Sequence, residues 1–203
     1  MINKASYIKR ILSAYVFNRS GSNTSFWHAG FSRQSKSIGS LEHYYLDYRN
    51  KVAYSGPYDS NGVPMLNYGG DIGQQYNPDA IAQYALGCFE LYLESGKNNF
   101  LNKFMNQAEW FMSNISMLDA DVGVWYYRFD FEYYEMLKNP WYTSLGQGHG
   151  ISVLVRAWKI TNDSKYLNVA HKAFASYERS IDHPGGICFV DPDNNLWFEE
   201  YII

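Results

Sequence analysis

The sequence predicts a mainly α-helical fold: an incomplete α/α-toroid of helical hairpins, accompanied by short β-hairpins. Apolar residues recur at helical spacing in four stretches between residues 78 and 177, which indicates helices that bury one face. These helices form two similar hairpins, and such a hairpin buries its apolar stripe only against neighbours. A closed ring needs more hairpins than this sequence contains, so we expect the toroid to be incomplete.

The first 40 residues form a separate predicted segment, and residues 41–203 form the predicted partial toroid. Ser6–Tyr15 has a short amphipathic pattern that favours a helix, whereas Asn18–Ser40 is rich in Ser and Gly and is typical of a loop. Leu41–Tyr54 alternates aromatic and charged residues, which predicts one or two short strands.

A turn is predicted at Pro57–Gly62, because the Asn61-Gly62 pair supports positive φ. Val63–Tyr68 is then a second short strand, which would complete a hairpin with the strands before the turn. Gly69–Gly73 is predicted to be a loop.

Asn77-Pro78 marks the start of the first helix of the predicted toroid, with Asn as the N-cap and Pro at the first helical position. Glu94–Gly96 ends this helix, and a second helix runs from about Asn98 to Met112. The pattern recurs as helices over His149–Trp158 and Lys165–Tyr177.

A shift of 66 residues relates the two hairpins, since it carries Phe100-Leu101 onto Tyr166-Leu167 and the turn at Ser95–Lys97 onto Thr161–Asp163. Between the hairpins, Val124–Phe129 is typical of a strand or an extended loop.

The last segment is predicted to be a β-hairpin. Ile187–Val190 is its first strand, Asp191–Asn195 its turn and Leu196–Tyr201 its return strand. Alternate side chains of a strand share a face, so Glu199 and Tyr201 would point one way and Glu200 the other.

Composition narrows the function classes. The net charge of −3 argues against a globally basic nucleic-acid binder, and no apolar run reaches the ~20 residues of a membrane helix. The first ten residues lack the apolar core of a signal peptide, which gives a cytoplasmic location by default. Two cysteines and five scattered histidines show no metal-ligand spacing. The aromatic content of 18% suits either a helical core or stacking on sugar rings.

Glu199, Glu200 and Tyr201 are the first candidate site. Adjacent carboxylates repel, so partial burial raises the pKa of one of them, and a Glu tuned in this way beside a Tyr can serve as an acid/base pair. Two exposed glutamates on an edge strand are the simpler explanation of the same pattern.

The second candidate is the glycine-rich segment from Gly146 to Gly150, which includes Gln147 and His149 and follows Trp141. Its glycines permit close backbone approach, and the N-terminus of the following helix offers amide donors to a sugar carboxylate. A packing contact between helix and loop is the alternative, and His149 is equally suited to the core.

The third candidate comprises Tyr76, Asn77 and Gln83. Asn77 is most simply an N-cap, and Gln83 is more simply a packing residue than a binding one.

Three segments together resemble the catalytic domain of D-glucuronyl C5-epimerases, which invert C5 of glucuronic acid in heparan-type polysaccharides. They are Tyr76–Tyr84, Trp141–Ala157 and Trp197–Tyr201, and the likeness extends from about Leu41 to the end. His149 stands where this family often has Gln, and Ile202 where it often has Pro.

The resemblance implies an α/α-toroid, no cofactor, a polyanionic polysaccharide substrate and a catalytic cleft containing Glu200 and Tyr201. It also implies substrate contacts from Tyr76, Asn77, Gln83, Trp141, Gln147, His149 and Glu199. Glu200 would be the base or the group that orients it, and Tyr201 a proton carrier or substrate hydrogen-bond partner. The family chain continues past the position of Ile203 with further hairpins, tyrosines and an arginine. We therefore expect this chain alone to exchange little or no C5 proton, and its open toroid edge to favour self-association.

Two other functions fit the same residues. A lyase or hydrolase of uronic-acid glycans would share the toroid, and a lyase would share the C5 proton abstraction before eliminating the 4-O substituent. A non-catalytic glycan-binding fragment would hold sugar through its aromatic residues and Gln147.

Overall fold

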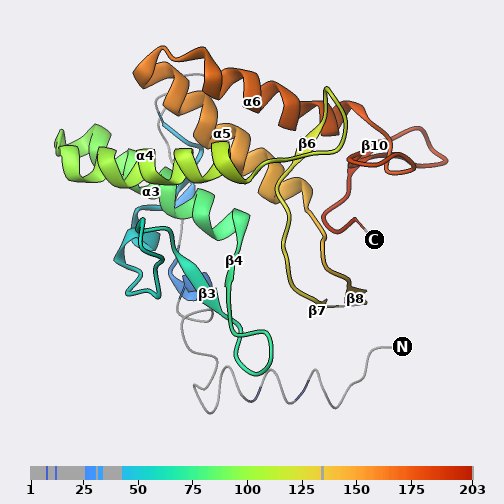
Figure 1. Cartoon of the computed structure of the whole chain (residues 1–203), viewed down its shortest axis with the longest axis horizontal. Helices are drawn as coiled ribbons and strands as arrows, with labels where there is room; N and C mark the ends of the chain where they lie inside the picture. The colour runs from blue at the N-terminus through green and yellow to red at the C-terminus, as the bar shows by residue number, and fades with distance from the viewer. Residues whose placement is uncertain are drawn as a thin grey trace.

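The computed structural model describes residues 8, 12, 26–30, 32–33, 43–133 and 135–202. Most of the predicted N-terminal helix Ser6–Tyr15 and loop Asn18–Ser40 therefore lies outside the described residues. Within them the fold is mainly α-helical with short antiparallel strand pairs, as predicted. Figure 1 shows the long helices stacked in layers, with strand pairs extending from one side of the stack.

The first helical hairpin begins where the sequence predicts. Helix α3 spans Pro78–Ser95, and the Asn77 side chain caps its N-terminus by accepting a hydrogen bond from the Ala80 amide at 2.9 Å. The helix ends at Gly96, whose φ of 66° is left-handed and suits glycine. Helix α4 follows over Asn98–Asn114.

The second hairpin begins earlier than predicted. Helix α5 spans Ser144–Thr161 rather than starting at His149, because Thr143 is its N-cap and accepts a hydrogen bond from the Gly146 amide at 2.9 Å. The glycine-rich segment therefore lies inside the helix and is not a loop before it. Helix α6 spans Ser164–Phe174 and continues into the 3-10 helix η3 at Ala175–Glu178.

The predicted shift of 66 residues holds for the backbone. It carries both ends of α3 onto both ends of α5, and it carries Gly96 onto Asn162, which ends α5 with a φ of 54°. Helix α3 packs against α4 and α5, and α5 packs against α6, so the two hairpins lie side by side (Figure 1). The arrangement of these hairpins in a toroidal ring stays a prediction.

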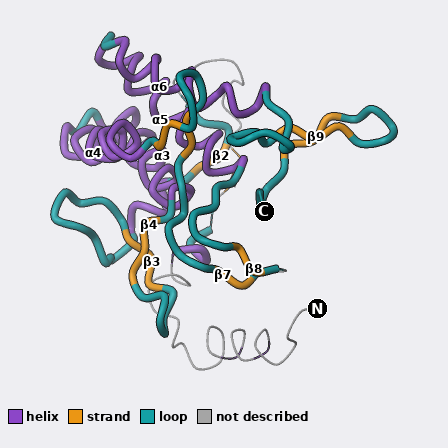
Figure 2. Tube along the Cα trace, turned by 45° about the vertical axis from the view of Figure 1, so that its right-hand side comes forward, coloured by secondary structure: helices purple, strands orange, loops and turns teal. Residues whose placement is uncertain are grey.

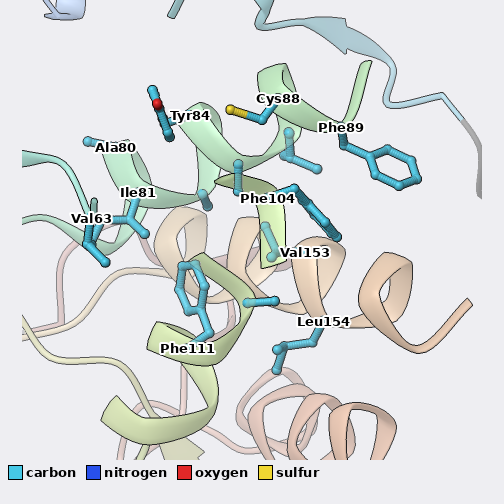
Figure 3. Close-up of a cluster of buried hydrophobic side chains, with 14 of the residues drawn as sticks. Val63, Ala80, Ile81, Tyr84, Cys88, Phe89, Phe104, Phe111, Val153 and Leu154 are labelled. Atoms are coloured by element: carbon cyan, nitrogen blue, oxygen red, sulfur yellow. The ribbon is translucent and has the colours of Figure 1, made fainter. Parts of the chain in front are cut away.

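The core lies between α3, α4 and α5, where aromatic and aliphatic side chains meet (Figure 3). Phe104 and Phe111 of α4 and Leu154 of α5 are almost completely buried there. Gly150 allows the Trp125 and Phe111 rings to approach α5, because a Cβ atom at this position would come within 2.7 Å and 2.9 Å of them.

One strand pairing differs from the prediction. Strand β3 at Met65–Asn67 pairs with β4 at Gln74–Tyr76, which follows the Val63–Tyr68 segment. Across the predicted turn, the hairpin is confirmed only in part, by an isolated antiparallel bridge between Tyr58 and Pro64. Of the predicted strand segment Leu41–Tyr54, the structure describes residues 43–54, and in these β2 at Leu46–Asp47 is the only strand. It pairs with β1 at Ser32–Arg33, and a 3-10 helix at Arg49–Ala53 follows it.

Three further antiparallel pairs surround the second hairpin. They are β5–β6 (Ser116–Met117 and Gly123–Val124), β7–β8 (Phe131–Glu132 and Met136–Leu137) and β9–β10 (Cys188–Val190 and Leu196–Phe198). The last pair confirms the predicted C-terminal hairpin, but its return strand ends at Phe198 and not at Tyr201. Figures 1 and 2 both show the C-terminal residues between the β7–β8 and β9–β10 pairs.

Candidate functional site

A pocket of about 300 Å³ opens at the N-terminal end of α5. Its lining comes from the segment before β2, the first two turns of α5, η3 and the C-terminal segment. The lining residues are Tyr44, Tyr45, Ser144, Leu145, Gly148, His149, Tyr177, Phe198 and Glu200. Two of the predicted site residues, His149 and Glu200, therefore share one pocket although they are far apart in the sequence.

His149 is held by two polar partners. Its Nδ1 atom forms a short hydrogen bond with the Asp79 carboxylate, and its Nε2 atom lies 3.2 Å from the Tyr48 hydroxyl. The second oxygen of Asp79 accepts a hydrogen bond from the Gln83 amide at 3.0 Å. All four residues are buried, so this chain of hydrogen bonds fixes the orientation of the imidazole ring.

Aromatic rings enclose the imidazole on the pocket side. The Tyr44 ring lies 5.6 Å from the ring of His149 and 5.8 Å from that of Tyr48, centroid to centroid. The Arg156 guanidinium lies 5.2 Å from the centre of the Tyr44 ring, and burial lowers the pKa of this arginine. The Tyr44 ring is therefore fixed between the imidazole and a cation.

Glu200 lies beyond the end of β10, where the chain bends and strand alternation no longer applies. Its side chain is exposed, whereas that of Glu199 is half-buried. Neighbouring protein atoms still remove enough solvent to raise the pKa of Glu200, the Asp79 carboxylate adds to this rise, and His149 opposes it. The backbone of Glu199 anchors this segment, because its amide donates to the Ile187 carbonyl at 2.9 Å and its carbonyl accepts from the Ser144 amide at 3.4 Å. The glutamate pair is thus attached to the start of α5.

Tyr201 faces an adjoining aromatic cluster. Its ring lies 4.9 Å from that of Tyr133 and 6.2 Å from that of Trp141, and burial raises its pKa. Trp141 stacks on the buried Tyr127 with ring centres 4.0 Å apart, and its indole NH donates to the Phe129 carbonyl at 2.7 Å. Trp141 thus supports Tyr201 from inside the fold.

The remaining predicted substrate contacts serve the protein's own structure. The Gln147 carbonyl accepts from the Trp125 amide at 2.9 Å and its NH₂ donates to the Gly123 carbonyl at 3.2 Å, so its side chain joins α5 to β6. The Tyr76 hydroxyl donates to Asp59 at 2.8 Å, and the Asn77 amide donates to the Tyr68 hydroxyl at 2.7 Å. We leave Gln147 and Tyr76 out of the proposed site.

The glycine-rich segment does not present a free helix N-terminus. Thr143 caps the Gly146 amide, and the Gln147 amide donates to the Thr143 carbonyl at 3.1 Å. Gly148 instead gives room to the Tyr177 hydroxyl, which donates to the Ser144 carbonyl at 2.6 Å. These amides therefore have partners within the protein, and their binding of a sugar carboxylate stays a prediction.

Asp79 is the site residue that the sequence patterns missed, since an acid in the first turn of a helix is common. A usable signal was the 66-residue repeat. The shift carries Gln83 onto His149, and the side chains at these equivalent positions both bond to the Asp79 carboxylate.

Across the residues that the structure describes, no group of three or more His, Cys, Asp or Glu side chains is placed to hold a metal ion. In the same ranges, no helix combines the length and apolar character needed to cross a membrane.

Comparisons with known proteins include a family match over the C-terminal part of the chain. A family model described as D-glucuronyl C5-epimerase C-terminus matches residues 119–203. The chain is 36% identical over 101 residues to the D-glucuronyl C5-epimerase of Caenorhabditis elegans, an alignment that covers 48% of this chain and 15% of that protein. It is 28% identical over 146 residues to an uncharacterized protein of Methanocaldococcus jannaschii, and this alignment covers 64% of this chain and 47% of that protein.

Proposed function

We propose that this protein contributes to C5 epimerisation of uronic acid units in a polyanionic polysaccharide of the heparosan or heparan type, because residues 119–203 match the family model described as D-glucuronyl C5-epimerase C-terminus. The observation that carries the proposal is the position of Glu200. This carboxyl group lies in the family-matched segment and lines the pocket together with His149, whose imidazole bonds to the buried Asp79.

The chemistry of the reaction explains why such a carboxyl group is needed. C5 of a uronic acid carries a proton next to a carboxylate, and removal of this proton leaves two negative charges on the intermediate. A base must therefore lie against one face of the ring and an acid against the other, with both groups fixed beforehand. A raised pKa suits Glu200 to proton transfer near neutral pH, because its protonated and ionised forms are then closer in free energy.

We assign Glu200 as the base or as the group that orients it, and Tyr201 as a proton carrier or a hydrogen-bond partner of the substrate. Tyr201 follows Glu200 in the chain, but its ring packs on Trp141 and Tyr133. It would therefore contact a sugar that lies partly in the pocket and partly over this aromatic cluster. The pocket of about 300 Å³ is at the lower limit of small-ligand sites, roughly 300–1,000 Å³. It would accept one sugar unit while the rest of the polymer stays outside.

Two features of the assembly belong to the same proposal. The two helical hairpins would form part of an α/α-toroid whose helix N-termini surround the cleft. Exposed apolar side chains on the β9–β10 hairpin, among them Val190, Leu196 and Trp197, would support association with a further copy or another toroid part.

Product analysis tests the reaction class. The protein is incubated with N-acetyl or de-N-sulfated glucuronyl polysaccharide, and the product is examined for C5-inverted uronic acid and for unsaturated uronic acid. A low yield of the inverted sugar without unsaturated product is expected. Ultraviolet absorbance of unsaturated ends would identify a lyase, and polysaccharide binding with neither product would leave a glycan-binding protein.

A further inference from the structure

Three aromatic side chains form a row that leads from the pocket onto the outer surface of the protein. Tyr177 and Phe198 line the pocket, and their ring centroids lie 5.1 Å apart. Phe174 does not line the pocket, but its ring lies 5.8 Å from that of Tyr177, with the two ring planes 25° apart. This aromatic row therefore begins in the pocket wall and ends outside it, where the end of α6 meets the β9–β10 pair (Figure 1).

The rings of the aromatic row are accessible and held in place. Phe174 is 49% exposed and Phe198 is 46% exposed, although both side chains are large and apolar. The Tyr177 hydroxyl donates to the Ser144 carbonyl at 2.6 Å, so the polar atom of this side chain is satisfied within the protein. Exposed rings that adjoin a pocket are typical of a surface that binds a ligand.

The shape of the aromatic row fits a linear ligand better than a protein partner. A stable protein interface buries about 800 Å² on each side, whereas a completely covered aromatic side chain contributes only about 150–250 Å². The exposed residues next to Phe174 and Tyr177 in the sequence, namely Lys172 and Glu178, are polar. A polysaccharide instead presents successive sugar units, each with an apolar C–H face that can stack on a ring.

We propose that the aromatic row binds the units of the uronic-acid polysaccharide that lie next to the unit in the pocket. The choice of ligand rests on the proposed function. Tyr177 and Phe198 contact the first neighbouring unit, because they belong to both the pocket and the row. Phe174 contacts a unit further along the polymer. The protein should consequently bind long saccharides more tightly than short ones.

Phe174→Leu tests the aromatic row where it has left the pocket. Leu keeps an apolar side chain but removes the ring, and the exposed position makes a large loss of stability unexpected. Phe174→Tyr keeps the ring. Phe189→Leu is the matched control, because Phe189 is 38% exposed and pairs with Trp197 on the face of the hairpin opposite to Phe198.

The measurement is isothermal titration calorimetry of the full chain with a heparosan disaccharide and a heparosan hexasaccharide. The wild type should bind the hexasaccharide more tightly. Phe174→Leu should weaken hexasaccharide binding about fivefold, the size expected for one lost stacking contact, and should change disaccharide binding by less than about twofold. Phe174→Tyr and Phe189→Leu should bind both saccharides as the wild type does.

Two results would overturn the aromatic row as a sugar site: equal affinity of the wild type for both saccharides, or an unchanged hexasaccharide affinity in Phe174→Leu. If that variant also self-associates less in sedimentation experiments, Phe174 belongs to a protein contact. If Phe174→Leu does not fold, the ring NMR signal of Phe174 still decides, with the signal missing from Phe174→Tyr as its assignment. This signal should shift with the hexasaccharide and stay unchanged with the disaccharide, and the absence of a shift would refute the contact.

Deuterium incorporation at C5 of the hexasaccharide separates this proposal from the proposed function. A length-dependent affinity that is lost in Phe174→Leu, without any incorporation by the wild type, would contradict the proposed function alone. Incorporation by the wild type, with an unchanged hexasaccharide affinity in Phe174→Leu, would contradict the role of the aromatic row alone.

Discussion

Substitution of Gly150 by Ala tests how α5 is held against the core. A methyl group at Gly150 would lie 2.7 Å from the Trp125 ring and 2.9 Å from the Phe111 ring, and both rings are buried. Trp125 is also fixed by hydrogen bonds from its indole NH to the Phe111 carbonyl and from its amide to the Gln147 side chain. The rings therefore cannot move aside without breaking these contacts.

The expected cost follows from two opposing effects. Overpacking of a filled core costs about 1–3 kcal/mol, and two contacts below 3.0 Å favour the upper half of that range. Ala stabilises a helix interior by about 1 kcal/mol relative to Gly. The net loss for Gly150→Ala should be about 1–2 kcal/mol, which lowers Tm by roughly 2–8 °C in a chain of this size.

Urea unfolding followed by circular dichroism gives the measurement, and Gly148→Ala is the matched control. A methyl group at Gly148 meets only the hydroxyl tip of Tyr177, which can move more easily than two enclosed rings. Gly148→Ala should therefore cost clearly less than Gly150→Ala. If Gly150→Ala were as stable as the wild type or more stable, the close contact of α5 with Trp125 would not be as tight as described.

Three other predictions concern local structure. Burial raises the pKa of Cys88 to about 12, so a thiol reagent at pH 8 should modify the half-buried Cys188 first and reach Cys88 only on unfolding. Equal modification rates of the two cysteines in the folded protein would contradict the buried position of Cys88. Burial lowers the pKa of Lys51 from 10.5 to about 8, with Asp79 opposing the shift. Between pH 8 and 10.5 the unfolded chain therefore holds a proton on Lys51 that the folded chain has lost. The unfolding free energy of the wild type should then rise with pH in this range, by up to about 1.4 kcal/mol per pH unit relative to that of Lys51→Met. If the unfolding free energies of the two proteins changed in parallel with pH, the shifted pKa of Lys51 would be refuted. Thr143→Ala should cost about 1 kcal/mol in urea unfolding by removing the α5 cap, and no loss would place the helix start elsewhere.

Local signals predicted the first hairpin well. Asn77-Pro78 is a local signal for the start of a helix, and Gly96 is a local signal for its end. Both ends of α3 can therefore be predicted without knowledge of the packing. The start of α5 was placed too late because three glycines weaken its helical pattern. Two of them, Gly148 and Gly150, make room for aromatic side chains that come from elsewhere in the chain, and a local pattern contains no information about these side chains.

The site was predictable only in part, for the same reason. Glu200 and His149 were recognised from their segments, but their shared pocket depends on the bend after β10 and on the pairing of α3 with α5. Asp79 forms a hydrogen bond with His149, which is 70 positions away in the sequence, and the residues next to Asp79 give no indication of this partner. Conversely, the family resemblance implied a substrate contact from Gln147, whereas the side chain of Gln147 forms hydrogen bonds that hold β6.

The rate of C5 deuterium incorporation from D₂O into glucuronyl polysaccharide, compared between the wild-type protein and Glu200→Gln, tests the central claim most directly. Gln keeps the size of the side chain and removes its ability to take up a proton. We predict a low but measurable incorporation by the wild type and its loss in a Glu200→Gln variant that still folds and binds the polysaccharide. Equal incorporation by both proteins, under conditions where the polysaccharide binds, would contradict the assignment of Glu200 as the base or as the group that orients it.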